Sequence, residues 1–237
     1  MTRELPQFKP AVWLVDTSTF SFPLRAQRWL ETGLVSGDEL EIAARYAHAK
    51  SQMQYLTGRA LVRHALASLT PRGAKPVRIV VDQQGKPVLA RALGQAPWHF
   101  NISHSGDLVA CALSRANVGI DIESISRATD HLAIAHAYFS PDEAIWIGAR
   151  QGSVNRRFVA LWTVKEAYLK AIGIGLAVPV AGVVTSAVGQ RCCKVVSRDL
   201  PGAHRWHCRL MKPAPDFWLA LCCEHAFERP SFNWAGL

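Results

Sequence analysis

The stretch 118–123, VGIDIE, constrains the fold of this chain more than any other, because apolar residues alternate in it with small or charged ones. Such alternation is typical of a β-strand with one buried face. The apolar residues share one face, and Gly119, Asp121 and Glu123 share the other. Residues two apart on a strand lie about 6.5–7 Å apart, so both carboxylates can converge on one hard cation.

Two interpretations of this strand remain open from the hexapeptide alone. Two neighbouring acids without a cation would repel each other, and Gly119 is expected to leave open space beside Asp121. These features favour a Mg²⁺ site, and Mg²⁺ usually accompanies phosphate. The alternative is an edge strand with a solvated polar face.

Composition limits the class of protein. The chain has 237 residues, 49% hydrophobic and 19% charged, so it can bury a core as one large domain or as two of about 120 residues each. It has no apolar run of 18 residues and no apolar signal-peptide core at its start, so we expect a cytoplasmic protein. The net charge of +9 implies an acidic partner, which charge alone does not identify.

The cysteines follow no metal-binding pattern. There is no C-x-x-C pair, and two of the pairs are vicinal, which suits neither ordinary disulfides nor zinc. A metal cluster with nearby histidines is conceivable, but we expect small buried thiols on the C-terminal strands. The residues concerned are Cys111, Cys192, Cys193, Cys208, Cys222, Cys223, His204, His207 and His225.

Helical spacing of apolar residues predicts one long helix over 38–69, followed by an antiparallel meander. The meander comprises a strand at 77–81, a turn at 82–87, a short strand at 88–89, an alternating strand from Trp98 to Ile102, a polar turn at 101–107, a buried strand at 108–113 and the carboxylate strand.

The second half repeats this order of a long helix and strands. We expect a helix at 130–138, a helix start at 140–143 with proline in first position, a long helix over 155–172, strands within 177–227 and a tail at 228–237. This repetition permits two similar subdomains that meet near residues 114–118.

The predicted helix 155–172 carries apolar side chains around much of its circumference, so it is expected to be well buried. Its charged residues Lys165, Glu166 and Lys170 then need partners or a function. Alone, Glu166 and Lys170 would be an ordinary ion pair one turn apart. Beside the carboxylate strand, a third carboxylate flanked by two lysines suits a metal and a polyphosphate.

His104 is a further candidate, in a Ser-His-Ser-Gly segment whose small residues leave backbone N–H groups open to an anion. Its imidazole can donate to a phosphate oxygen. A serine hydrolase is the competing idea, but Ser103 and Ser105 lack the G-x-S-x-G elbow.

Three segments together resemble the signature motifs of 4′-phosphopantetheinyl transferases, in the large pseudodimeric class typified by the surfactin synthetase activator. They are HFNISHSG at 99–106, GIDIE at 119–123 and WTVKEAYLK at 162–170. The GKP turn at 85–87 and the helical segment at 56–63 also resemble this family.

The resemblance covers about residues 40–180 and implies an α+β pseudodimer. Each of its two similar subdomains would pack a long helix on an antiparallel sheet, with the active site in the cleft between them. Residues 1–115 would form the coenzyme A nucleotide side, and residues 116–237 would carry the metal and catalytic motifs.

The implied reaction transfers 4′-phosphopantetheine from coenzyme A to a serine of an apo acyl or peptidyl carrier protein, and releases adenosine 3′,5′-bisphosphate. The resemblance implies a cytoplasmic monomer that uses Mg²⁺ and acts on an acidic carrier protein, with no nucleic-acid or membrane partner. The positive net charge would steer that carrier.

The resemblance also implies roles for single residues. Asp121, Glu123 and Glu166 would hold Mg²⁺. Glu166, or a metal-bound water, would take the serine proton, and Lys170 and Asp121 complete the catalytic set. Coenzyme A would be bound by Gly85, Lys86, Pro87, Ser103, His104, Lys165 and Lys170. The early basic cluster that often holds the 3′-phosphate is reduced here to Arg45, so Arg45, Lys50 and Arg59 are the candidates.

Two other functions remain as alternatives. A metal-dependent nuclease would fit the acids, the lysines and the basic charge, but its usual lysine two residues after the strand glutamate is Ile125 here. A non-catalytic carrier-binding module would not need three carboxylates with flanking lysines.

Overall fold

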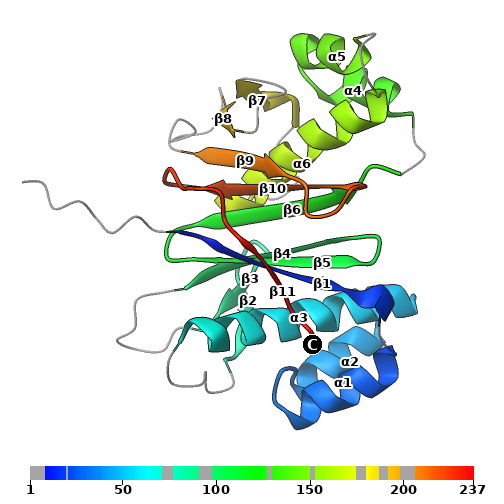
Figure 1. The fold of residues 1–237 in the computed structure, drawn as a ribbon, viewed down its shortest axis with the longest axis vertical. Coiled ribbons are helices and arrows are strands. Elements are labelled where there is room, and N and C mark those ends of the chain that lie inside the picture. The colour runs from blue at the N-terminus through cyan, green and yellow to red at the C-terminus, as the bar shows by residue number, and fades with distance from the viewer. Residues whose placement is uncertain are drawn as a thin grey trace, which may run out of the picture. The chain divides into compact units, whose positions relative to one another are not determined.

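The computed structural model describes residues 9–19, 21–70, 77–90, 98–126, 130–149, 153–174, 180–186, 192–197 and 206–237. The fold is α+β and combines helices with mainly antiparallel sheets (Figure 1). Contacts divide the described chain into two compact units. We call them the N-unit, residues 10–115 with 230–237, and the C-unit, Lys9 with residues 116–229. The chain passes from the N-unit to the C-unit after Arg115, and residues 230–237 lie with the N-unit.

The N-unit places its long helix α3 on one face of a sheet with strand order β11-β1-β5-β4 (Figure 1). Strand β1 pairs antiparallel with β5 and parallel with β11, and β2 and β3 form a separate hairpin. The elements are β1 (Ala11–Asp16), η1 (Thr17–Thr19), α1 (Phe22–Glu31), α2 (Gly37–Ala44), α3 (Ala49–Leu69), β2 (Ile79–Val81), β3 (Pro87–Leu89), β4 (His99–Ser105), β5 (Leu108–Ser114) and β11 (Phe232–Trp234).

The prediction of a single helix over 38–69 is wrong, because two helices occupy this stretch. Helix α2 begins with a capping box between Ser36 and Glu39 and ends at Arg45. Extended backbone at His48, with φ −113° and ψ 130°, then starts α3. Helical apolar spacing continues through the break, so periodicity alone does not reveal it.

Two further expectations for this unit are corrected. Residues 101–105 belong to strand β4, and only Gly106 and Asp107 form the turn into β5. The residues expected to form a tail contain β11, which pairs with Val12–Leu14 of β1. The segment 232–234 is too short to show a strand pattern, so its pairing with the distant strand β1 cannot be predicted from its sequence.

The C-unit places helix α6 against a sheet with strand order β6-β10-β9-β8-β7. Its elements are β6 (Val118–Ser124), α4 (His131–Tyr138), α5 (Pro141–Gly148), α6 (Val154–Ile172), η3 (Val180–Gly182), β7 (Val183–Ser186), β8 (Cys192–Ser197), β9 (His207–Met211) and β10 (Phe217–Cys223). The predicted helix start at Pro141 is confirmed, and there the Ser140 backbone N–H donates to Oε2 of Glu143 at 3.1 Å. Helix α6 ends as predicted at Gly173, which has φ +80°.

The expectation of unlinked cysteines is wrong for one pair. Cys208 and Cys222 lie opposite each other on β9 and β10 and form a disulfide. Antiparallel pairing brings these residues together although 14 positions separate them. Cys223 is a buried free thiol, and burial raises its pKa to about 12.

Candidate active site

Glycine at position 119 lets helix α6 approach strand β6 closely. A Cβ atom at Gly119 would lie 2.0 Å from the Ala167 carbonyl oxygen and 2.4 Å from the Ala171 nitrogen. The expectation of open space at Gly119 is therefore wrong, because the α6 backbone fills it. This contact brings the charged residues of α6 beside the carboxylate strand.

Three carboxylates influence one another in the C-unit. Asp121 is buried, with 2% of its surface exposed, and Glu123 is half-buried two residues further along β6. Burial raises the pKa of Glu166, Lys170 opposes this shift, and Asp121 and Glu123 add to it. The buried Oε1 of Glu166 has no hydrogen-bond partner within the described residues. The prediction that α6 adds a third acid to the strand pair thus has an electrostatic basis in the structure.

Lys170 bridges from helix to strand. Its Nζ donates to Oδ1 of Asp121 at 2.6 Å, and the two side chains are 28% and 3% exposed. The simple alternative from sequence was an ion pair between Glu166 and Lys170 along the helix. The short contact made by Lys170 goes to the strand instead, and it places an ammonium group among the carboxylates.

Lys165 has a different environment from the one expected. Its fully buried Nζ donates to Oε2 of Glu143 at 2.7 Å and to the Val180 carbonyl at 3.1 Å. The other oxygen of Glu143 accepts bonds from the Thr185 backbone and hydroxyl, both at 3.2 Å. Burial lowers the pKa of Lys165, and Glu143 opposes this shift. The geometry gives Lys165 a structural partner in place of the expected phosphate contact.

The carboxylates do not form a ready-made metal cluster. Within the described ranges, no group of three His, Cys, Asp or Glu side chains is arranged to hold a metal ion. The chemistry of the donors nevertheless suits Mg²⁺, which prefers carboxylate oxygens. The orphaned, buried oxygen of Glu166 and the mutual repulsion of the acids would both be relieved by a cation. The residues therefore fit Mg²⁺, although Lys170 holds one of them.

The predicted GKP turn lies between β2 and β3 of the N-unit. Gly85 has φ +83°, which favours glycine, and its N–H donates to the Asp82 carbonyl at 3.1 Å. The Lys86 backbone N–H donates to Oδ1 of Asp82 at 2.8 Å. Burial lowers the pKa of the Lys86 side chain, against the effect of Asp82. Pro87 begins β3.

Ser103 and His104 are neighbours on β4, so their side chains point to opposite faces of the strand. Ser103 is 5% exposed, whereas His104 is exposed. The structure therefore does not bring these two side chains to a common face. The sequence had placed both in a turn, where no such alternation applies.

The three cations proposed for the 3′-phosphate have different surroundings. Arg45 is exposed at the end of α2, and Lys50 forms an exposed ion pair with Asp107 at 2.8 Å. Arg59 is only 8% exposed, lies 3.9 Å from Glu39 and stacks over Tyr55. Arg45 and Lys50 are thus open to a ligand, and Arg59 is largely enclosed.

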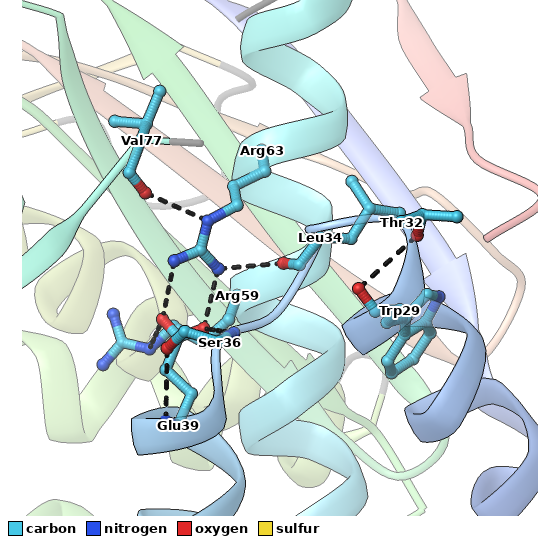
Figure 2. A network of polar contacts seen from close by, with 8 residues as sticks. All are labelled: Trp29, Thr32, Leu34, Ser36, Glu39, Arg59, Arg63 and Val77. Carbon is cyan, nitrogen blue, oxygen red and sulfur yellow. Dashed lines mark hydrogen bonds and ion pairs between the residues drawn. The ribbon is translucent and has the colours of Figure 1, made fainter. Parts of the chain in front are cut away.

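Sequence reasoning missed the network around Glu39 (Figure 2). Arg63 donates to both carboxylate oxygens of Glu39, at 2.7 and 3.0 Å, and to the carbonyls of Leu34 and Val77. These bonds join α2, α3 and the segment before β2. The buried cations Arg59 and Arg63 thus have a structural role that the sequence pattern did not indicate.

A pocket of about 240 Å³ in the C-unit was also missed. Its lining residues come from β6, α4 and α6: Glu123, Ser124, His131, Ile134, Phe158, Val159 and Trp162. The His131 ring stacks on Phe158 at 4.4 Å, and its Nδ1 bonds Oδ1 of Asn155 at 2.9 Å. The one-turn spacing of Phe158 and Trp162 on α6 was the available signal, but it indicated only buried surface.

Comparisons with known proteins agree with the resemblance. Residues 117–222 match the family model of the 4′-phosphopantetheinyl transferase superfamily, and residues 23–116 match that of the 4′-phosphopantetheinyl transferase N-terminal region. The 4′-phosphopantetheinyl transferase Sfp of Bacillus subtilis is 31% identical over 81% of this chain and 83% of its own length. The 4′-phosphopantetheinyl transferase gsp of Aneurinibacillus migulanus is 36% identical over 62% of this chain, and the match spans 59% of that relative.

A solved structure also overlaps the chain. The holo-[acyl-carrier-protein] synthase of Thermotoga maritima covers 47% of this chain and 64% of its own, with 21% identity and a TM-score of 0.38, which is too low to establish a shared fold. Neither the nuclease nor the binding-module alternative gains support from these relatives. Within the described residues, no helix is long and apolar enough to cross a membrane. The family-model matches and the similarity to Sfp establish that the chain belongs to the 4′-phosphopantetheinyl transferase family.

Proposed function

We propose that this protein transfers the 4′-phosphopantetheine group of coenzyme A to a serine hydroxyl of an apo carrier protein and releases adenosine 3′,5′-bisphosphate. The observation that carries the proposal is the contact of the Lys170 Nζ with Asp121 at 2.6 Å, which joins the carboxylate strand to the helix that carries Glu166. Transfer of a phosphoryl group depends on positioning and on neutralising charge, and acids with a lysine supply both. Membership of the transferase family supports the same conclusion.

Asp121, Glu123 and Glu166 would hold Mg²⁺, which when bound neutralises charge on the diphosphate of coenzyme A. Glu166 would accept the serine proton as the general base. Lys170 would bind a phosphate oxygen. Lys165 is left out of this set because Glu143 and Val180 hold its ammonium group.

For coenzyme A binding, we propose Arg45 and Lys50 at the 3′-phosphate, since both are exposed. Lys86, the turn at Gly85 and Pro87, Ser103 and His104 remain candidates for the nucleotide and phosphates. The aromatic pocket beside Glu123 offers an apolar surface to the uncharged pantetheine arm. That the two units are similar halves of a pseudodimer with a cleft active site stays a prediction.

The direct test is intact-mass analysis of apo carrier proteins incubated with this protein, coenzyme A and Mg²⁺. A carrier should gain one phosphopantetheine. Asp121→Ala should abolish this mass gain while the protein stays folded. The matched control is Asp142→Ala, which removes an exposed acid on α5 and should leave the protein active. Absence of any mass gain across carriers of several pathways, or full activity of Asp121→Ala at limiting Mg²⁺, would reject the assignment.

We also propose that the carrier is acidic, because the transferase has a net charge of +9. The carrier KM should then rise with ionic strength, because salt screens long-range attraction. Steady-state kinetics from about 20 to 200 mM salt would measure this rise, and a flat carrier KM would remove the steering role. A cytoplasmic monomer remains our expectation, which fractionation and sedimentation would examine.

A further inference from the structure

In the described part of the C-unit, Lys170 forms an ion pair with Asp121, the most buried acid of the carboxylate cluster. Its Nζ lies 2.6 Å from Oδ1 of Asp121, whose side chain is 97% enclosed. Glu166 stands one turn before Lys170 on α6, so the ammonium group lies near acids of both the strand and the helix. Lys170 therefore occupies the electrostatic position that a metal ion would take.

Lys170 and a bound Mg²⁺ ion would compete for the carboxylate of Asp121. A Mg²⁺ ion that binds Asp121 would meet the positive charge of Lys170 a few ångströms away, and at partly buried sites such repulsion is only weakly screened. Lys170 is 28% exposed at the last turn of α6, so its flexible side chain has room to move. Lys165 has no such freedom, because it is fully buried against Glu143.

We propose that Lys170 is an internal counter-cation of Asp121, which Mg²⁺ displaces and which the diphosphate of coenzyme A then captures. This inference rests on the proposed function. A phosphate group would draw the ammonium away from Asp121 and open the carboxylate to the metal. Metal and coenzyme A then bind cooperatively, and each tightens the other by the same factor.

The test measures metal binding without turnover. Mn²⁺ prefers the same oxygen ligands as Mg²⁺ and can be followed by electron paramagnetic resonance. For wild type, Lys170→Gln and Lys170→Arg, free Mn²⁺ is titrated with and without coenzyme A. Removal of the competing charge should tighten Mn²⁺ binding alone by about tenfold in Lys170→Gln, while Lys170→Arg should stay close to wild type. Coenzyme A should tighten Mn²⁺ binding by about tenfold in wild type and by less than about threefold in Lys170→Gln.

The control is Arg156→Gln, which removes one positive charge from the exposed first turn of the same helix. It should leave Mn²⁺ binding unchanged, and a thermal melt would confirm that every variant is folded. Equal or weaker Mn²⁺ binding by Lys170→Gln without coenzyme A would overturn the inference, and so would tightening by Arg156→Gln of the same size. If wild type fails to bind coenzyme A even with Mn²⁺, the proposed function fails. The Mn²⁺ titrations without coenzyme A would still decide whether Lys170 competes with the metal.

Discussion

Both units lay a long helix on a sheet, but helices α3 and α6 treat their buried charges differently. On α3, Arg59 and Arg63 share the carboxylate of Glu39, and Arg63 also bonds two backbone carbonyls. On α6, Lys165 is paired just as completely with Glu143, whereas five residues further on Lys170 contacts Asp121, near Glu123 and Glu166. Balanced buried charges fix helices in place, and we expect the cluster of acids on β6 and α6 to bind a cation.

The contact between the long helix and the sheet also differs between the two units. Helix α3 meets strand β4 at Gly58, where a Cβ atom would lie 3.0 Å from Cγ2 of the Ile102 side chain. Strand β6 meets α6 at Gly119, where a Cβ atom would overlap backbone atoms of Ala167 and Ala171. The C-unit thus tolerates less change at the contact that positions its charged residues.

The largest effect should come from adding one methyl group to this contact. Gly119→Ala should lower the free energy of unfolding by at least about 3 kcal/mol or prevent folding, because only a shift of the α6 backbone removes the overlap. Gly58→Ala is the matched control. It should change stability by no more than about 1 kcal/mol, because the gain in helix propensity offsets the displacement of Ile102. Chemical denaturation measures both, and a Gly119→Ala protein as stable as wild type would contradict the packing described.

A second comparison separates the two lysines of α6. Lys165→Met should lower the free energy of unfolding by about 3–5 kcal/mol, because it leaves the carboxylate of Glu143 buried without its ammonium partner. Lys170→Met should cost less than Lys165→Met, because the Lys170 side chain is 28% exposed whereas Lys165 is fully buried, although Asp121 also loses its ammonium partner. Denaturant titration gives these values, and coenzyme A titration of the folded proteins should show weakened binding only for Lys170→Met. Normal stability with lost coenzyme A binding in Lys165→Met would restore the phosphate role that its sequence position suggested.

The smallest expected effect is a change in melting temperature, which should have opposite signs for matched Glu→Gln substitutions in the two units. Without metal, Glu166→Gln should raise the melting temperature at pH 7, because burial and two neighbouring acids disfavour the glutamate charge. A carboxyl group with a raised pKa stabilises the fold below its unfolded pKa of about 4.3, and that stability is lost as pH rises through the folded pKa. The gain should therefore vanish toward pH 4. Turnover of Glu166→Gln should nevertheless fall about 10²–10⁴-fold.

Glu39→Gln is the counterpart in the N-unit and should lower the melting temperature at pH 7, because Arg63 loses a charged acceptor. Calorimetry across pH 4–8 in the presence of a chelator would compare the two variants. If both substitutions destabilise equally, the two clusters do not differ in the way their geometry indicates.

The sequence predicted those elements whose signal is local. The strand at 118–123 and the glycine-ended helix α6 were both predicted and are confirmed, but both faces of the strand are buried up to Ile122, not one as the alternation indicated. The break between α2 and α3 was not predicted, because helical spacing runs through it. The different surroundings of Lys165 and Lys170 depend on partners 22 and 49 positions away, Glu143 and Asp121, which no local pattern encodes.

The parallel pairing of β11 with β1 has a consequence for how the chain assembles during synthesis. Strand β1 is made first, yet its neighbour at Phe232–Trp234 emerges only after all of residues 116–229. Until then one edge of β1 lacks a backbone partner, and an open edge can pair with other chains. The N-unit, although it is synthesised first, therefore cannot complete its sheet until the residues after the C-unit have been synthesised.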